Sequence, residues 1–392
     1  MYKFNLLKNI DSSQFVSSCC ACMLMMFSPV SFAIDDIRDN GEYKLKKVVS
    51  GFGIPWGMSF LSEDLLIITE KRGRLSLVDL TLGQPNSVEQ IKGLPPIMQV
   101  GQGGLLDVKV EPSSLVNDDL PMLYFSYVAN SSLAGKSRLP TLKLARAQLK
   151  GLDLINLQVL FEANYPQKGG RHFGSRIAFD GKGYVYFSMG DRGERNNAQK
   201  LSRHSGSIFR LHLDGTVPVD NPFVGLRNAM PEIWSYGHRN PQGLMFDQVS
   251  QRLWSIEHGP RGGDEINLVE MGRNYGWPVI SYGREYASNF KVSKTAVKEG
   301  MEQPVYYYTP SIAPSSLLVH SGKRFPEWRG ALLSGALKLR HLNVVKVDQE
   351  SQFKSEQRFF EEESQRIRNV VESPQGAIYL STDSGNVFQV VR

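Results

Sequence analysis

The chain has 392 residues, of which 41% are hydrophobic and 21% are charged. This composition is typical of a globular protein with a large core, and it excludes a disordered chain, a collagen and a polytopic membrane protein. The 45 basic and 39 acidic side chains give a net charge of +6. Because the basic residues form no block, nucleic acid is not an expected partner.

Residues 1–33 have the layout of a secretory signal peptide. Two lysines precede an apolar run at residues 19–27, and small residues stand before a cleavage position between Ala33 and Ile34. We therefore expect a mature domain at 34–392 that is periplasmic or secreted and has no stable membrane insertion after cleavage. The alternative is an uncleaved membrane anchor, for which this apolar run is short.

All 3 cysteines, Cys19, Cys20 and Cys22, lie in this leader. The mature chain would therefore contain none. That excludes disulfides, a cysteine-ligated zinc or iron–sulfur site, and a thiol nucleophile.

After the leader, the sequence predicts strands and no long amphipathic helix. Short β-rich runs separated by turn residues occur at 65–68, 75–78, 122–128, 184–189, 253–256, 331–333 and 377–381. A repeat of strand, acidic turn, glycine and strand is found at 66–78, at 186–211 with an insertion, and at 379–390. Such hairpin repeats indicate an all-β β-propeller with about six to eight blades. A β-sandwich or a pair of barrels remains the alternative.

Loops dense in glycine and polar residues are candidates for the functional site, since a rigid scaffold commonly displays its site on loops. They lie at 101–107, 169–176, 237–243 and 257–265, and a further one lies at 274–278. Glycine lets a backbone approach a ligand closely, which suits a planar cofactor or an ion held by carbonyl groups.

His172 is the best candidate for a general base, because a neutral imidazole can take a proton from an alcohol near pH 7. We expect the neighbouring Arg171 and Arg176 to lower its pKa. The alternative is a surface histidine that only forms hydrogen bonds.

Asp264, Glu265 and Tyr275, together with carbonyl groups exposed by a Gly-Pro pair, could bind a hard cation such as Ca²⁺ through oxygen ligands. The sequence has no EF-hand loop, and a solvated acidic turn is the alternative.

Near the C-terminus, basic residues alternate at Lys338 and Arg340 and again at Arg366 and Arg368. In a strand, Arg366 and Arg368 point to one face and repel each other unless an anion lies between them. A multiply charged carboxylate or phosphate ligand would satisfy them, and a solvent-facing basic stripe is the alternative. The sequence has no P-loop, GxSxG or HExxH motif, so NTP hydrolysis, an α/β-hydrolase and a zincin have no support.

Taken together, the ordered segments GQGGLLD, RHFGSR, GDRG, GHRNPQG, EHGPRGGDEIN and NYGWP resemble the soluble, pyrroloquinoline quinone (PQQ)-dependent sugar dehydrogenases, in particular the aldose sugar dehydrogenase branch. The resemblance covers nearly the whole mature chain. It implies a six-bladed β-propeller that oxidises the C1 hydroxyl of aldoses to lactones by hydride transfer to the quinone. It also implies an external electron acceptor, bound Ca²⁺, and a monomer or weak dimer.

The resemblance assigns roles to individual residues. His172 corresponds to the catalytic base, and Asp191 to the carboxylate that orients it. The residues that correspond to cofactor contacts are Gln102, Arg239, Asn240, Lys338, Arg366 and Arg368. The residues that correspond to metal ligands are the carbonyls of Gly259 and Pro260 for a Ca²⁺ beside the quinone, and Glu265 and Tyr275 for a second, structural Ca²⁺.

Two departures from the glucose dehydrogenase branch weaken glucose as the preferred substrate. His258 stands where that branch has glutamine, and the long insertions of that branch are missing. A Ca²⁺-dependent propeller lactonase and a catalytically silent binding propeller are the competing interpretations. Retention of His172 together with Lys338, Arg366 and Arg368 argues against both.

Overall fold

The computed structural model describes residues 42–392 apart from 83–86, 117–119, 134 and 136–137. The predicted signal peptide lies outside the described residues and stays a prediction. None of the helices in the described part of the chain is long and apolar enough to cross a membrane.

The structure is built from four-stranded antiparallel sheets. Each is formed by strands that follow one another along the chain, except that β1 joins the last three strands. Counted from the inside outward, the first three sheets are β2 (Pro55–Phe60), β3 (Leu65–Glu70), β4 (Arg74–Asp79) and β5 (Val88–Ile91); β6 (Leu105–Val110), β7 (Met122–Asn130), β8 (Pro140–Lys150) and β9 (Asp153–Glu162); and β10 (Ile177–Phe179), β11 (Tyr184–Met189), β12 (Ser207–His212) and β13 (Ile233–Tyr236).

The other three sheets are β14 (Pro241–Asp247), β15 (Arg252–Glu257), β16 (Asp264–Val269) and β17 (Tyr306–Tyr308); β18 (Leu318–Val319), β19 (Leu332–Gly335), β20 (Leu342–Val347) and β21 (Phe353–Phe359); and β22 (Ile367–Glu372), β23 (Ile378–Thr382), β24 (Val387–Val391) and β1 (Lys44–Val49). Short 3₁₀ helices occur at Pro112–Leu115, Arg195–Gln199 and Pro326–Trp328.

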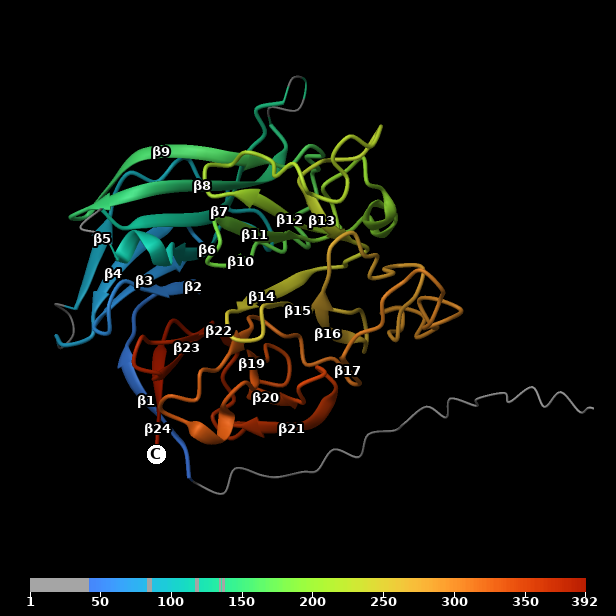
Figure 1. Cartoon of the computed structure of the whole chain (residues 1–392). Coiled ribbons are helices and arrows are strands. Elements are labelled where there is room, and N and C mark those ends of the chain that lie inside the picture. The colour runs from blue at the N-terminus through green and yellow to red at the C-terminus, as the bar shows by residue number, and fades with distance from the viewer. Residues whose placement is uncertain (1–41, 83–86, 117–119, 134, 136–137) are drawn as a thin grey trace, which may run out of the picture. The chain divides into compact units, whose positions relative to one another are not determined.

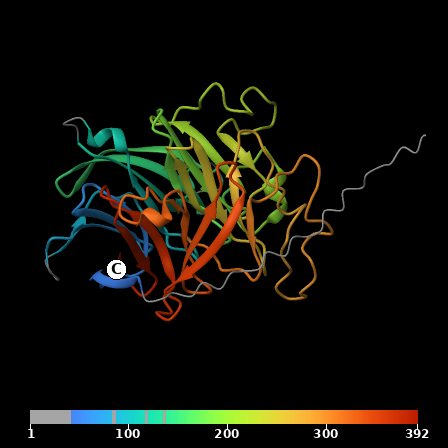
Figure 2. The ribbon, with the colours of Figure 1, turned by 60° about the horizontal axis from the view of Figure 1, so that its bottom comes forward.

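The sheets follow one another round a closed ring, with β2, β6, β10, β14 and β22 nearest its centre (Figure 1). Among the innermost strands, β2 contacts both β6 and β22, and β14 contacts both β10 and β18. β1 pairs with β24, so the beginning of the described chain completes the last sheet. The long connection between β16 and β17 stands out from the sheets in both views (Figures 1 and 2).

The middle strands are apolar on both faces because each sheet packs between two neighbours. β3 reads LLIITE, and every residue after its first is buried. The same holds for β11, which reads YVYFSM. This burial explains why the sequence shows continuous apolar runs here in place of a simple alternation.

One arginine ties the innermost strands together at the centre of the ring. Arg176 is buried and stands directly before β10. Its N–H groups donate to the Asp107 carboxylate and to the carbonyl oxygens of Trp56, Gln242, Ser315 and Arg368. These five acceptors lie on β2, β6, β14 and β22 and just before β18, so all five N–H donors of the guanidinium are used.

The prediction of an all-β propeller is confirmed, with six blades. The three repeated sequence units correspond to the paired strands β3–β4, β11–β12 and β23–β24, each pair being the second and third strands of a blade. The sandwich and two-barrel alternatives are excluded, because every sheet is a separate four-stranded blade.

We predict that Arg176→Lys destabilises the propeller by about 3–5 kcal/mol, because an ammonium has three donors and leaves buried acceptors unpaired. Chemical denaturation followed by tryptophan fluorescence measures this effect. Arg227→Lys, at an exposed loop position, is the matched control and should change the free energy of unfolding little. Equal stability of the two variants would contradict the central role of Arg176.

Candidate active site

The candidate residues gather at one end of the innermost strands, in the loops that enter them. Gln102 precedes β6, His172 precedes β10, Asn240 precedes β14 and Arg366 precedes β22. Because every blade begins with its innermost strand, these four entry loops meet at the same mouth of the ring.

The glycine-rich loops approach one another closely at this mouth. The backbone of Gly101 has a φ of +55°, and a Cβ there would lie 2.3 Å from the carbonyl oxygen of Gly170. A Cβ on Gly190 would lie 2.5 Å from the carbonyl oxygen of His172. We expected these glycines to admit a ligand; the structure shows that they also let the loops pack against each other.

His172 and Asp191 form a hydrogen-bonded pair. The His172 Nδ1 lies 2.6 Å from Asp191 Oδ1. The other carboxylate oxygen of Asp191 accepts a hydrogen bond from Trp277 Nε1 at 2.8 Å. The His172 backbone N–H donates to Gln102 Oε1 at 2.7 Å, which links the two predicted loops directly. Since an ionised carboxylate only accepts, Nδ1 carries the proton and Nε2 is left as the basic atom.

The surroundings keep this imidazole neutral. Burial lowers the pKa of His172, and the positive charges of Arg239 and Arg192 lower it further, whereas Asp191 raises it. The predicted direction is therefore right, but the predicted causes, Arg171 and Arg176, are wrong. Arg176 instead points into the centre of the ring.

Arg192 is one of the residues that sequence reasoning missed. Its guanidinium carbon lies 3.3 Å from the ring centroid of Phe173, and it donates to the carbonyl oxygens of Gly169 and Arg171. It therefore holds the loop that carries His172. Its place in the GDRG segment was the available signal.

A cavity of about 220 Å³ opens among these loops. Its polar and charged lining residues are Lys71, Gln102, Asn240, Gln242, His258, Arg366 and Arg368, and its apolar ones are Ile54, Trp56, Ala313 and Leu337. The positive side chains lie close together, since Arg366 and Arg368 share the Asp383 carboxylate and the charge of Arg368 acts on Lys71. The Arg368 guanidinium carbon is 4.4 Å from the Trp56 ring centroid.

The anion predicted between Arg366 and Arg368 is supplied by the protein itself. Asp383 Oδ2 accepts from Arg366 Nε at 2.8 Å, and Asp383 Oδ1 accepts from Arg368 Nε at 2.8 Å. Burial raises the pKa of Asp383, but the hydrogen bonds and charges of the two arginines outweigh it and lower the pKa overall. With two arginines to one carboxylate, the cluster keeps a positive charge.

The predicted lysine contact, Lys338, is not a lining residue of the cavity, whereas another lysine is. Lys338 is exposed, and only its neighbour Leu337 lines the cavity. Lys71, which sequence reasoning missed, lines the cavity, and its Nζ donates to the Gly101 carbonyl oxygen at 2.6 Å. Burial lowers the pKa of Lys71, and the charge of Arg368 adds to that effect.

Arg239 and Asn240 connect the cavity to the predicted metal site. Asn240 lines the cavity, and Arg239 lines the small space that contains predicted metal ligands. Arg239 Nη1 donates to the His258 carbonyl oxygen at 3.0 Å, and its guanidinium carbon lies 5.3 Å from the Trp277 ring centroid. Asn240 Oδ1 accepts from the Gly174 backbone N–H at 3.1 Å. Both residues are thus held by neighbouring loops.

Three of the four predicted metal ligands line a much smaller space of about 10 Å³, which is room for one ion or water, and Pro260 is not among its lining residues. Gly259, Glu265 and Tyr275 line it together with Glu257. Burial raises the pKa of Glu265 well above its usual range, and the charge of Glu257 raises it further.

Two of these oxygens already have partners. The Tyr275 hydroxyl donates to the Leu268 carbonyl oxygen at 2.6 Å, and the Pro260 carbonyl oxygen accepts from Ser311 Oγ at 3.0 Å. In the residues described, no group of three or more His, Cys, Asp or Glu side chains could hold a metal. A cation here would therefore depend on backbone carbonyls, as hard cations commonly do.

The fold and the site together define a propeller enzyme with a histidine–carboxylate pair beside a positively lined cavity. The family model for Glucose / Sorbosone dehydrogenase matches residues 52–389, and the chain belongs to that family. The prediction of an oxidoreductase is thereby confirmed.

Named relatives agree with this assignment. The aldose sugar dehydrogenase YliI of Escherichia coli is 36% identical over 376 residues, covering 95% of this chain and 96% of the relative. The crystal structure of the soluble aldose sugar dehydrogenase from Escherichia coli, in its apo-form, superposes with a TM-score of 0.82 at 32% identity, covering 89% of this chain and 99% of that chain. A PQQ-bound aldose sugar dehydrogenase from Streptomyces coelicolor shares the fold, with a TM-score of 0.73 at 24% identity, covering 89% and 97%.

We predict that Asp191→Asn lowers the pKa of His172 further, because it removes the nearby negative charge that raises this pKa. NMR titration of the His172 imidazole measures the shift. Asp383→Asn, which neutralises a carboxylate elsewhere at the same mouth, is the control and should move the His172 titration less. An unchanged titration in Asp191→Asn would contradict the pairing.

Proposed function

We propose that this protein is a PQQ-dependent aldose sugar dehydrogenase that oxidises the C1 hydroxyl of aldose sugars to lactones. The observation that carries the proposal is the neutral His172, paired with Asp191 at the mouth where the positively lined cavity opens. The Escherichia coli relative, named an aldose sugar dehydrogenase, supports the substrate class. The Streptomyces coelicolor neighbour, solved with PQQ, supports the cofactor.

The cavity fits an anionic planar cofactor. Arg366 and Arg368 each keep N–H groups beyond those bound to Asp383, and Lys71 adds a third cation. We assign Lys338, which follows the lining residue Leu337, as a further cofactor contact. Trp56 and Leu337 provide apolar walls. We assign Gln102, Arg239 and Asn240 to the other polar contacts with the cofactor. When bound, PQQ supplies a quinone that accepts hydride from the sugar and later passes electrons to an external acceptor.

His172 accepts the proton of the sugar C1 hydroxyl at Nε2. Asp191 stabilises the imidazolium that results, because it already accepts the Nδ1 hydrogen bond. Trp277 donates to the second oxygen of Asp191 and holds that carboxylate in place. Arg239 and Arg192 favour loss of the proton afterwards, since both disfavour a charged imidazole.

Ca²⁺ belongs to this proposal, with the Gly259 and Pro260 carbonyls beside the quinone and Glu265 and Tyr275 at a second site. A cation would stabilise the charged form of Glu265, whose pKa is raised by burial and by Glu257. It would also polarise the quinone as a Lewis acid. Because the Tyr275 hydroxyl is already hydrogen-bonded within the protein, we assign its backbone carbonyl to the cation.

The proposed mature enzyme is the domain at 34–392, exported to the periplasm or secreted after cleavage of the leader, and it acts as a monomer or weak dimer. Aldoses are the proposed substrate class, and glucose is not assigned as the preferred one. His258, the residue that departs from the glucose branch, lines the cavity and lies with Nε2 2.6 Å from the Pro314 carbonyl oxygen.

Reconstitution tests the function. We expect purified apo-protein with added PQQ and Ca²⁺ to reduce a dye when given aldoses, and His172→Gln to reduce turnover by about 10²–10⁴-fold while PQQ still binds. His212→Gln, at the end of β12, is the matched control and should keep its turnover. Near-normal turnover in His172→Gln would contradict the assigned base. Hydrolysis of lactones without dye reduction would favour the lactonase interpretation.

A separate prediction concerns the cofactor wall. Arg368→Ala should raise the Kd for PQQ by about 10- to 100-fold, because charge-assisted hydrogen bonds are lost, and saturating PQQ should restore much of the activity. Titration of the apo-protein at fixed Ca²⁺ measures this. Arg252→Ala is the control, since Arg252 contacts Gln349 and Ser351 outside the cavity. Identical titration curves for Arg368→Ala and wild type would remove Arg368 from the cofactor site.

Ca²⁺ binding should stabilise the native state by mass action. We expect the melting temperature to fall on chelation and to recover when Ca²⁺ is restored, and Glu265→Gln to weaken this recovery. Thermal melts with and without chelator check it. A melting temperature that does not change when the chelator is added would contradict the proposal that Ca²⁺ binds.

A further inference from the structure

A second and larger cavity, of about 550 Å³, opens at the opposite ends of the innermost strands. Phe60 ends β2, Lys109 lies near the end of β6, Met245 lies in the second half of β14, and Glu372 ends β22. The catalytic loops enter these same strands at their beginnings. The volume is in the range of small-molecule sites, roughly 300–1,000 Å³.

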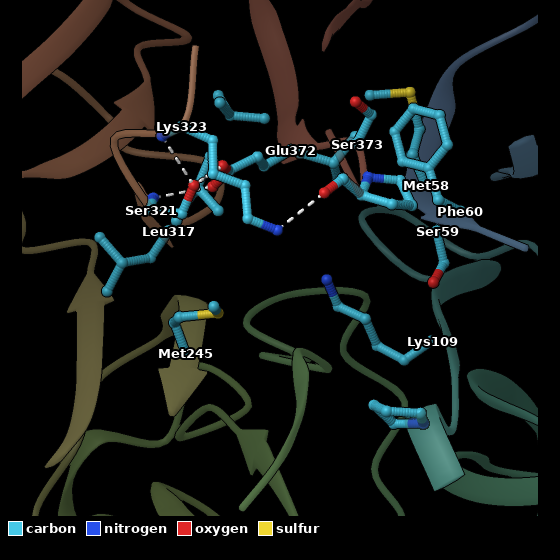
Figure 3. Close-up of a pocket in the computed structure, with 15 residues that line it drawn as sticks. Met58, Ser59, Phe60, Lys109, Met245, Leu317, Ser321, Lys323, Glu372 and Ser373 are labelled. Atoms are coloured by element: carbon cyan, nitrogen blue, oxygen red, sulfur yellow. Dashed lines mark hydrogen bonds between the residues drawn. The ribbon is translucent and has the colours of Figure 1, made fainter. Parts of the chain in front are cut away.

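Most of the wall is apolar. Phe60, Met245, Leu317 and Val370 line the cavity from separate blades, and Figure 3 shows the first three around it. Arg176 and its acceptors fill the centre of the ring between this cavity and the catalytic one. The two cavities are therefore separate compartments.

Two ammonium groups reach into this apolar space. Lys109 and Lys323 extend toward it from different sides (Figure 3). Lys323 Nζ donates to the Pro374 carbonyl oxygen at 2.8 Å. Lys109 Nζ has no hydrogen bond or ion pair with any residue in the described ranges. Burial lowers the pKa of Lys109, Arg176 lowers it further, and Asp107 opposes both.

The one carboxylate among the lining residues does not neutralise this pair. Glu372 accepts hydrogen bonds from the backbone N–H of Ser321, at 3.0 Å, and from its hydroxyl. His320 Nδ1 lies 3.1 Å from the same carboxylate. The Glu372 carboxylate is therefore bound to the Ser321 loop and does not pair with Lys109. The cavity keeps the ammonium of Lys109 beside an apolar wall.

We propose that this cavity binds an organic anion with a single carboxylate and an apolar body, such as a medium-chain fatty acid. The carboxylate pairs with Lys109, with Lys323 close by, and the body packs on Phe60, Met245 and Leu317. The partnerless ammonium selects a negative head group, and the apolar wall selects against a sugar or a free phosphate. This site goes beyond the proposed sugar oxidation and does not depend on it.

Isothermal titration calorimetry with decanoate, and with decanol as the uncharged probe, tests the proposal on the protein with and without PQQ and Ca²⁺. We expect saturable decanoate binding of equal affinity in both states. Lys109→Met should weaken decanoate by about 10- to 100-fold and leave decanol binding unchanged. Met245→Trp, which fills the cavity, should weaken both probes. Lys150→Met, at the exposed end of β8, is the matched control and should change neither.

Three results would overturn the proposal: wild-type protein that shows no saturable decanoate binding, Lys109→Met that binds decanoate as wild type does, and decanoate that binds only when PQQ is absent. The last result would place decanoate in the catalytic cavity. Thermal melts establish that each variant is folded, and Met245→Trp provides a test that leaves the charge of Lys109 in place. None of these readouts uses turnover, so failure here is distinguishable from failure of the proposed dehydrogenase activity.

Discussion

The structure depends on the guanidinium of Arg176 at the centre of the ring. The innermost strands turn backbone carbonyls toward the axis, and a buried carbonyl needs a donor. Arg176 satisfies four of them together with the Asp107 carboxylate, so one side chain fixes strands from different blades relative to one another. The same residue opens β10 and lies four positions after His172. The position of the proposed base is thereby tied to the centre of the fold.

Opposing charges act on the imidazole of His172, the proposed base. Burial, Arg239 and Arg192 favour a neutral imidazole, and Asp191 alone among the named groups favours the protonated one. Across the cavity, Asp383 holds Arg366 and Arg368 together without cancelling their combined charge. An incoming anionic group therefore meets a preorganised positive surface and does not have to bring two repelling arginines together.

The sequence was sufficient for the architecture, because β-rich runs and repeated hairpin units are local signals. The resemblance of their loops to those of the sugar dehydrogenase family also predicted that His172, Gln102 and Asn240 belong to one site. The sequence could not show that Asp383 lies between Arg366 and Arg368. The alternation of side chains along a strand predicts the face on which each lies but not the carboxylate that it contacts. Nor could it separate His172 from Arg176. Positive φ values at His172, Gly174 and Ser175 turn the chain sharply, so His172 faces Asp191 whereas Arg176 points into the centre of the ring.

The pairing of β1 with β24 has a consequence for the order of folding. Lys44 lies opposite Val391, so the last blade is assembled from the two extremes of the described chain. Contacts this distant in sequence carry the largest loop-closure entropy and tend to form late. Until they form, β24 presents an unpaired strand edge, which is a template for association between chains. The nascent protein is therefore most exposed to aggregation in the interval between synthesis of its C-terminus and closure of the ring.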